Sequence, residues 1–248
     1  MNTIGVLWLR QIKRHYRSKA RMIGSLAMPL LFLVAFGFGF GSIYAQAGQG
    51  NYMQFLVPGM VSMTILFASV MSGIEIIWDR QFGFLKETLV APVPRLEIMI
   101  GRTLGGATVA FAQGFLFLLL SLLFGFNIIS WTLFPVALLF MALIALFFAA
   151  FGTAIASLLD DMQGFQLIMN FLIMPIFFLS GAIFPLNTAP AAIQWISKIN
   201  PLTYGVNGIR SCLLGTAQSS ILGNLILLSV LTIIILVIGS KLFSKMQI

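Results

Sequence analysis

The sequence contains little charge. Of its 248 residues, 14 are Lys or Arg and 6 are Asp or Glu, which is 8% of the chain, against roughly 25% in an average soluble domain. Apolar types make up 60% of the residues. A soluble fold needs a polar surface and a disordered chain needs low hydrophobicity, so both classes are excluded. The composition predicts an integral membrane protein.

Cysteine and histidine are also scarce, since Cys212 and His15 are the only residues of their kinds. An intrachain disulfide, a cysteine metal cluster and a histidine-based metal site or triad are therefore excluded by count. With so few carboxylates as well, a membrane-embedded enzyme has no catalytic constellation. We attribute the net charge of +8 to basic cytoplasmic ends that meet anionic lipid, not to nucleic-acid binding.

Six stretches are apolar enough to cross a membrane, because one helical crossing takes about 20 such residues. They cover residues 22–44, 55–77, 103–126, 131–159, 165–184 and 221–243. The sequence therefore predicts an all-α, polytopic membrane protein with six transmembrane helices, in a single domain over residues 1–248.

The basic residues predict the orientation of these helices. Twelve of the fourteen lie before the first span, between the second and third, or at the end of the chain, where Lys241 and Lys245 stand, and only Lys198 and Arg210 fall on the other side. This bias places both termini in the cytoplasm. The stretch Ala45-Gln46-Ala47 is similar to a signal-peptide cleavage site, but the apolar run before it is too long for a signal peptide.

Residues 1–21 are predicted to form an amphipathic helix in the cytoplasmic interface of the membrane. Trp8 belongs to an apolar face at helical spacing, while Arg10, Arg14 and Arg17 lie on another face. The pattern fits two roles equally: a basic anchor at the membrane, or a helix that also contacts a cytoplasmic partner.

Residues 75–102 carry four of the six acidic residues and four basic ones, and 78–102 is predicted to be a cytoplasmic loop. A short helix is expected from Arg80 to Leu89, because the prolines at 92 and 94 stop it. Charged runs are usually solvated, but apolar side chains alternate with the charges here. A short amphipathic helix of this kind favours a protein partner over water.

Residues 185–219, on the outer side, are too polar to span the membrane and too apolar for a free loop. Thr188 and Pro190 predict the start of one short helix, and a second is expected from Thr203 to Leu214 with Gly215 as its cap. Two helices that dip into the outer leaflet fit this pattern, and two interfacial helices without a function are the alternative.

The stretch WDRQFGFLKETLVAPVPRLEIMIGR resembles the coupling segment of ABC-2 type exporter membrane subunits, which reads ER-x-x-G-T/S-L-E-x-L-L-x-x-P and continues to a basic residue and a Gly-Lys/Arg pair. Asp79-Arg80 takes the place of the usual acidic-basic pair. Phe84 replaces a small hydroxyl residue, and Lys86 replaces the usual Glu, with Glu87 one place later. The other matching positions are Gly83, Leu85, Leu89, Pro92, Arg95, Gly101 and Arg102.

A second stretch, FLSGAIFPLNTAPAAIQWISKINPLTYGVNGIR, is similar to the end of span five and the outer half-helices of the same family. The shared elements are FLSG-x-x-FP and NPLTY…R, and they look closest to the drug and lipo-oligosaccharide exporter branch. The residues of interest in this outer segment are Pro185, Pro190, Pro201, Tyr204 and Arg210.

The resemblance implies a membrane subunit that does not hydrolyse ATP and works with a second copy and two separate ATPase subunits in a prokaryotic inner membrane. The sequence contains no G-x-x-x-x-G-K-[ST] phosphate loop, so ATP and Mg would be bound by the ATPase subunits, with no cofactor in this chain. By analogy, the helix 80–91 would seat in a groove on the ATPase. The coupling residues would be Glu75, Asp79, Arg80, Gly83, Phe84, Leu85, Lys86, Glu87, Leu89, Pro92 and Arg95.

No charged residue lies at the centre of a predicted span, which disfavours an ion-coupled carrier or channel. An uncharged path between two membrane subunits suits an amphipathic or hydrophobic substrate such as a drug, a lipid or a lipid-linked oligosaccharide. Polysaccharide export is the alternative. The candidate pathway residues are Phe32, Phe36, Phe40, Met60, Met63 and Asn170. Rows of Phe and Met usually serve packing, and a mid-span Asn more often forms an interhelical hydrogen bond. The pair Gly101-x-x-x-Gly105 would allow close helix packing.

Overall fold

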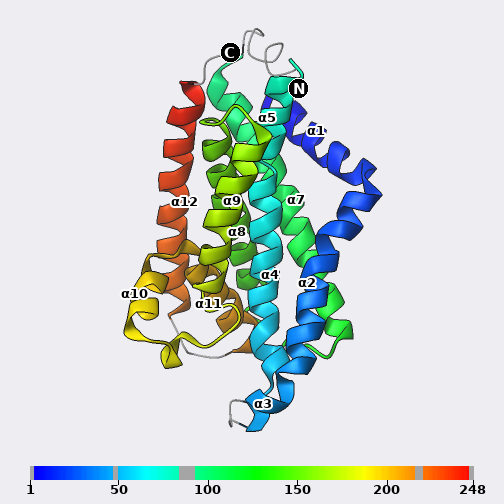
Figure 1. Ribbon diagram of the computed structural model, residues 1–248, viewed down its shortest axis with the longest axis vertical. Coiled ribbons are helices and arrows are strands. Elements are labelled where there is room, and N and C mark those ends of the chain that lie inside the picture. The colour runs from blue at the N-terminus through cyan, green and yellow to red at the C-terminus, as the bar shows by residue number, and fades with distance from the viewer. Residues whose placement is uncertain (1–2, 47–49, 84–92, 216–219, 246–248) are drawn as a thin grey trace.

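Helices account for all regular secondary structure in the residues that the computed structural model describes, which are 3–46, 50–83, 93–215 and 220–245. Most of them run side by side as a bundle, and α1 slants across one side (Figure 1). The helices are α1 (Thr3–Arg17), α2 (Lys19–Gly39), α3 (Gly41–Gln46), α4 (Tyr52–Met71), α5 (Ile74–Gln81), α7 (Arg95–Leu123), α8 (Phe134–Ala156), α9 (Met162–Phe178), η1 (Leu186–Thr188), α10 (Ala191–Ile199), α11 (Pro201–Leu214) and α12 (Ile221–Ser244). The all-α prediction is confirmed.

Five helical segments among the described residues are long and apolar enough to cross a membrane. They are Met22–Gly39, Tyr52–Gln81, Arg95–Leu123, Phe134–Ala156 and Ile221–Ser244. The remaining predicted span, 165–184, corresponds to α9, which has 17 residues and ends at Phe178. The helix does not extend further because Gly181, in the turn that follows, has a φ of 76°, which is incompatible with a right-handed α-helix.

The central position of α4 explains why its sequence is apolar on all sides. It packs against α2, α7, α8 and α11, and Leu56, Met60 and Leu66 are fully buried. The equally apolar α12 differs, because residues such as Leu222 and Ile233 are exposed on its outer side. An apolar helix with an exposed apolar surface is expected where lipid is the neighbour.

Two glycines set the direction in which α4 continues into α5. A Cβ at Gly73 would lie 2.5 Å from the carbonyl oxygen of Gly152 in α8, and a Cβ at Gly152 would lie 2.7 Å from the carbonyl oxygen of Val70. Only glycine at both positions allows this backbone contact. The contact fixes the start of α5 against α8, and α5 carries the charged residues of the site described below.

The bundle has two distinct ends. The start of α1, α5, the start of α7 and the end of α12 lie at one end, whereas α3 and α10 lie toward the other (Figure 1). The described parts of the segments 78–102 and 185–219 thus lie toward opposite ends of the bundle.

Candidate functional site

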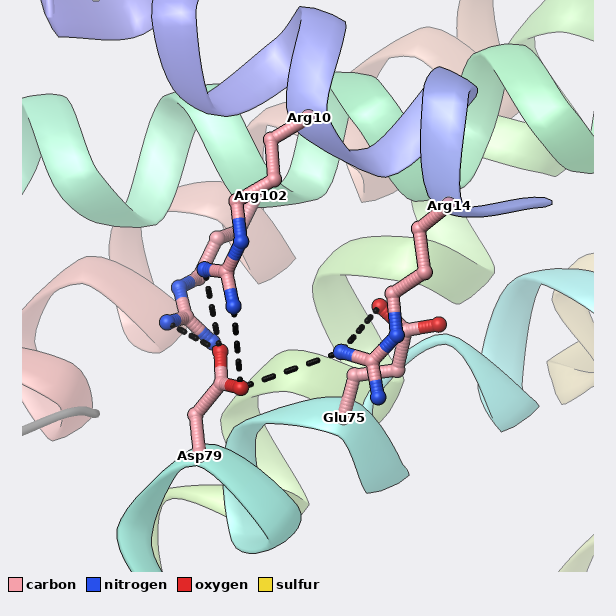
Figure 2. A network of polar contacts seen from close by, with 5 residues as sticks. All are labelled: Arg10, Arg14, Glu75, Asp79 and Arg102. Carbon is pink, nitrogen blue, oxygen red and sulfur yellow. Dashed lines mark hydrogen bonds and ion pairs between the residues drawn. The ribbon is translucent and has the colours of Figure 1, made fainter. Parts of the chain in front are cut away.

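Five charged side chains from three helices meet at the end of the bundle that holds α5 (Figure 2). The ion-pair cluster consists of Arg10 and Arg14 from α1, Glu75 and Asp79 from α5, and Arg102 from α7. The sequence separates these residues by up to 92 positions, so the cluster exists only because the three helices converge. It fastens α1 and α7 to α5.

Asp79 is the centre of the cluster. Its Oδ2 accepts a hydrogen bond of 2.7 Å from Nη2 of Arg102, and its two oxygens receive the guanidinium of Arg10 at 3.2 and 3.3 Å. Nη1 of Arg14 lies 3.7 Å from Asp79 and 3.5 Å from Glu75. Three cations face two carboxylates, so the cluster keeps one net positive charge, and each carboxylate is held by charge-assisted contacts.

The length of the helices explains how so many charges are tolerated in such an apolar chain. The run from Tyr52 to Gln81 has 30 residues, which at 1.5 Å per residue is about 45 Å, whereas the hydrocarbon core of a bilayer is about 30 Å thick. Asp79 lies in the last turn of this run. A run of this length therefore leaves room for the cluster to lie beyond the hydrocarbon.

Two glycines of α7 let α1 approach closely. A Cβ at Gly105 would lie 2.6 Å from the side chain of Gln11, and a Cβ at Gly101 would lie 3.0 Å from the carbonyl oxygen of Ile4. The close packing predicted from the Gly101-x-x-x-Gly105 spacing is thus confirmed, with α1 as the partner. Nε1 of Trp8 donates a hydrogen bond of 3.0 Å to Thr108, which fixes the register of the two helices.

A helix is observed within residues 1–21 as α1, which ends at Arg17. Arg10 and Arg14 are in the ion-pair cluster, whereas Arg17 is exposed. Two of the three arginines that share a face in the sequence pattern, Arg10 and Arg14, are therefore turned toward the protein.

The predicted loop 78–102 is helical at both ends, so this expectation is corrected. Glu75 and Asp79 lie in α5, and α7 already begins at Arg95. The charges of this stretch favour a loop, but arginines of α1 and α7 pair with Asp79, so the helix can continue past it. The segment 82–94 connects the two helices.

A helix that starts at Arg80 and runs through residue 83 is not observed. Arg80 is in the last turn of α5, Phe82 caps that helix, and Gly83 has a φ of 80°, which breaks it. The other predicted coupling residues in this connection lie outside the described residues; they are Phe84, Leu85, Lys86, Glu87, Leu89 and Pro92.

Both flanks of the connection are anchored to the bundle. Nη1 of Arg80 lies 2.5 Å from Oδ1 of Asp160, in the turn between α8 and α9. On the other flank, Nη1 of Arg95 donates a hydrogen bond of 2.7 Å to the carbonyl oxygen of Ser244, at the end of α12. A force applied to residues 82–94 would therefore reach α5, α7, α9 and α12 directly.

At the other end, Arg210 of α11 is 6% exposed and binds backbone oxygens in place of a carboxylate. Its Nη2 donates to the carbonyl oxygens of Phe55, at 3.2 Å, and Gly181, at 3.0 Å, and its guanidinium lies 3.9 Å from the centre of the Phe55 ring. The residue thus ties α11 to α4 and to the turn after α9.

The two predicted outer helices are observed as α10 and α11. Pro201 is at the first position of α11, so this helix begins two residues before the predicted start at Thr203. Gly215 closes it with a φ of 65°, as predicted. The first helix begins later than expected, because residues 186–188 form a separate 3-10 turn and Pro190 directly precedes α10. The hydroxyl of Tyr204 donates to the carbonyl oxygen of Lys198, which joins the two helices, and Pro185 precedes the 3-10 turn.

The predicted pathway residues belong to α2 and its C-cap, to α4 and to α9. Phe32, Phe36 and Phe40 stack along α2, with ring centres 5.3 and 5.7 Å apart. Met60 and Met63 are buried in α4. Asn170 is exposed on α9 and makes no hydrogen bond to another described residue, so the expected interhelical bond is not formed within this chain.

Sequence reasoning missed one polar contact. Nε2 of Gln113 lies 3.0 Å from Nε2 of His15, which joins the middle of α7 to the end of α1. Gln113 is a polar residue within the apolar stretch 103–126, but the sequence does not identify its partner, because the angle between α1 and α7 is a tertiary property.

A bundle of long apolar helices, with its charges gathered at one end, defines a multi-pass membrane protein. Residues 2–214 match the ABC-2 type transporter family, so the chain belongs to that family. It is therefore the membrane permease subunit of such a transporter, a kind of subunit that lacks the ATPase domain.

Similar proteins come from several lineages. The chain is 31% identical over 197 residues to ycf38 of Cyanophora paradoxa, which covers 78% of this chain and 68% of that one. It is 29% identical over 216 residues to nodulation protein J of Rhizobium meliloti, covering 84% and 82% of the two chains. It is 27% identical over 212 residues to the inner membrane transport permease YadH of Escherichia coli, again covering 84% and 82%.

Proposed function

We propose that this protein forms, with a second copy of itself, the membrane pathway of an ATP-driven exporter, and that two separate ATPase subunits bind ATP and Mg. The observation that carries the proposal is the ion-pair cluster of α1, α5 and α7 at the base of the 82–94 connection. A connection anchored in this way can receive a movement from outside the membrane and pass it to several helices.

In this proposal both termini are cytoplasmic and six helices cross the membrane, with α9 as a short crossing that α10 and α11 complement on the outer side. Two lines of support are the charge bias of the connecting segments and the inner-membrane location in the name of the similar YadH permease. In this proposal ATP and Mg are bound by the ATPase subunits and not by this chain.

The substrate we propose is an amphipathic or hydrophobic molecule such as a drug, a lipid or a lipid-linked oligosaccharide. The described ionic side chains are gathered at the end of the bundle that holds α5, apart from Lys198 and Arg210 on the outer side, and the helices between are apolar. A path of this kind offers no partner to a strongly charged cargo. A polysaccharide is the second candidate substrate within the same architecture.

The docking of an ATPase can be tested by co-purification. Phe82 is 82% exposed, so Phe82→Asp should leave the fold intact while it replaces an exposed apolar side chain at the start of the 82–94 connection with a charge. Phe84→Asp tests the neighbouring position of the connection. Ile199→Asp is the matched control, because Ile199 is equally exposed, at 83%, in α10 near the opposite end of the bundle.

We expect the two phenylalanine variants to lose the ATPase subunit and the isoleucine variant to retain it, with all three inserted in the membrane at parental levels. Retention of the ATPase by both phenylalanine variants, or full transport in vesicles that lack any ATPase, would refute the proposal.

A further inference from the structure

A largely apolar cavity of about 490 Å³ lies next to the ion-pair cluster. Its walls come from the end of α1, the first half of α2, the second half of α4 and the middle of α7, with Met174 of α9 at one side. Met63, Phe67 and Met71 supply apolar surface, and Glu75 belongs both to this cavity and to the cluster. The volume is in the range of sites for small organic ligands.

One buried polar atom in the cavity lining, Oε1 of Gln113, accepts no hydrogen bond from a described residue. Gln113 lines the cavity and is 7% exposed, and its Nε2 is engaged with His15. Its Oε1 is buried and has no hydrogen-bond partner among the described residues. Buried amide oxygens in folded proteins are almost always paired, so this atom points to a donor from a molecule other than the chain.

We propose that the cavity binds an amphipathic molecule, whose apolar body packs against Met63, Phe67 and Met71 and whose hydroxyl or amine head donates a hydrogen bond to Oε1 of Gln113. The site lies within one chain and requires no ATPase, so it stands independently of the proposed export. The ligand chemistry is shared by membrane lipids with an amine head and by soluble amphiphiles, and the experiment separates these two sources.

Occupancy of the cavity can be measured from the reactivity of a cysteine introduced into its lining. Gly24 lines the cavity, and a Cβ added there meets no atom within 4 Å, so Gly24→Cys should fold normally. Gly39→Cys is the matched control, because Gly39 is on the same helix, is equally open and lies outside the cavity lining. Cys212 is buried, so the parent protein gives a low background of labelling.

The measurement is the rate at which N-ethylmaleimide labels the full-length, detergent-purified variants. Dodecan-1-ol is the probe with a donor, and 1-methoxydodecane is the same chain without one. We expect dodecanol to slow the labelling of Gly24→Cys about fivefold more than the ether does, which is the effect of one net hydrogen bond. Labelling of Gly39→Cys should not change with either probe.

The role of Gln113 is tested by adding Gln113→Leu to Gly24→Cys, which should remove the difference between the two probes. The comparison of the probes in the Gly24→Cys protein does not depend on the folding of this second variant. Equal slowing by the two probes would overturn the proposal, since the amide oxygen would then be satisfied by water. Unchanged labelling with both probes would overturn it as well.

Labelling in nanodiscs distinguishes a membrane lipid from a soluble amphiphile as the ligand. The same labelling is compared in phosphatidylcholine alone and in phosphatidylcholine with phosphatidylethanolamine, whose ammonium is a donor. Slower labelling with phosphatidylethanolamine supports the proposal with a membrane lipid as occupant. Slower labelling with dodecanol alone supports it with a soluble amphiphile as occupant.

Discussion

Asp79 of α5 and Arg102 of α7 form an ion pair of 2.7 Å, with 8% and 4% of their side chains exposed. The two residues stand near opposite ends of the stretch that resembles the coupling segment of the family, 23 positions apart. Their pairing closes the base of the 82–94 connection. The charged positions near its two ends are therefore joined to each other, and a partner protein would contact what lies between them.

Asp79→Asn should lower the free energy of unfolding by about 3–5 kcal/mol, because it leaves the buried guanidinium of Arg102 without its counter-charge. The measurement is equilibrium unfolding in mixed detergent micelles. Arg10→Gln should cost less, about 1 kcal/mol or below, because Arg10 is 32% exposed. A loss for Asp79→Asn no larger than that for Arg10→Gln would contradict a buried, structural pair.

The periodicity and composition of the sequence predicted most of the helices, since long apolar runs can only become membrane helices in a chain with so few charges. Where prediction failed, the cause was tertiary pairing. The charge of Asp79 indicates a loop, but arginines from α1 and α7 pair with it, which allows it to lie in a helix.

The cavity and its polar atom could not be predicted for the same reason. The pattern of α1 shows which residues share a face, but not that His15 reaches Gln113 in α7. The glycine spacing in α7 did predict a close helix contact, but not which helix would fill it, because the same spacing serves any neighbour. Patterns along one helix therefore predict surfaces, and the partners of these surfaces require the structure.

Gly105→Leu should detach α1 from α7, because even a Cβ at this position would lie 2.6 Å from the side chain of Gln11. The detachment would break the hydrogen bond between Trp8 and Thr108 and expose Trp8 further. We expect a red shift of tryptophan emission and faster proteolysis within residues 3–17. Gly5→Ala is the control on α1, because an added Cβ there meets nothing within 4 Å, and it should behave as the parent protein does. An unchanged spectrum for Gly105→Leu would count against the packing of α1 on α7.

Arg210→Lys should destabilise the outer part of the bundle by about 1–2 kcal/mol although the charge is kept. The planar guanidinium bonds two carbonyl oxygens and stacks on Phe55 at once, and a single ammonium group cannot do all three. The reciprocal change Lys198→Arg is the control, because Lys198 lies at the surface over the exposed ring of Trp195, and it should change stability by less than about 0.5 kcal/mol. Thermal unfolding in detergent measures both, and equal stability of the two variants would contradict a structural role for Arg210.

The orientation can be read by chemical labelling, because the parent chain has one cysteine, Cys212, and it is buried. Phe82→Cys and Ile199→Cys place thiols at positions that are 82% and 83% exposed in the single chain, near opposite ends of the bundle. The basic residues concentrate on the side of Phe82, so the positive-inside rule puts that side in the cytoplasm. A membrane-impermeant maleimide applied to intact spheroplasts should therefore label Ile199→Cys, and should label Phe82→Cys only after lysis. Labelling of Phe82→Cys in intact spheroplasts would invert the topology and would remove the segment 82–94 from the reach of any cytoplasmic ATPase.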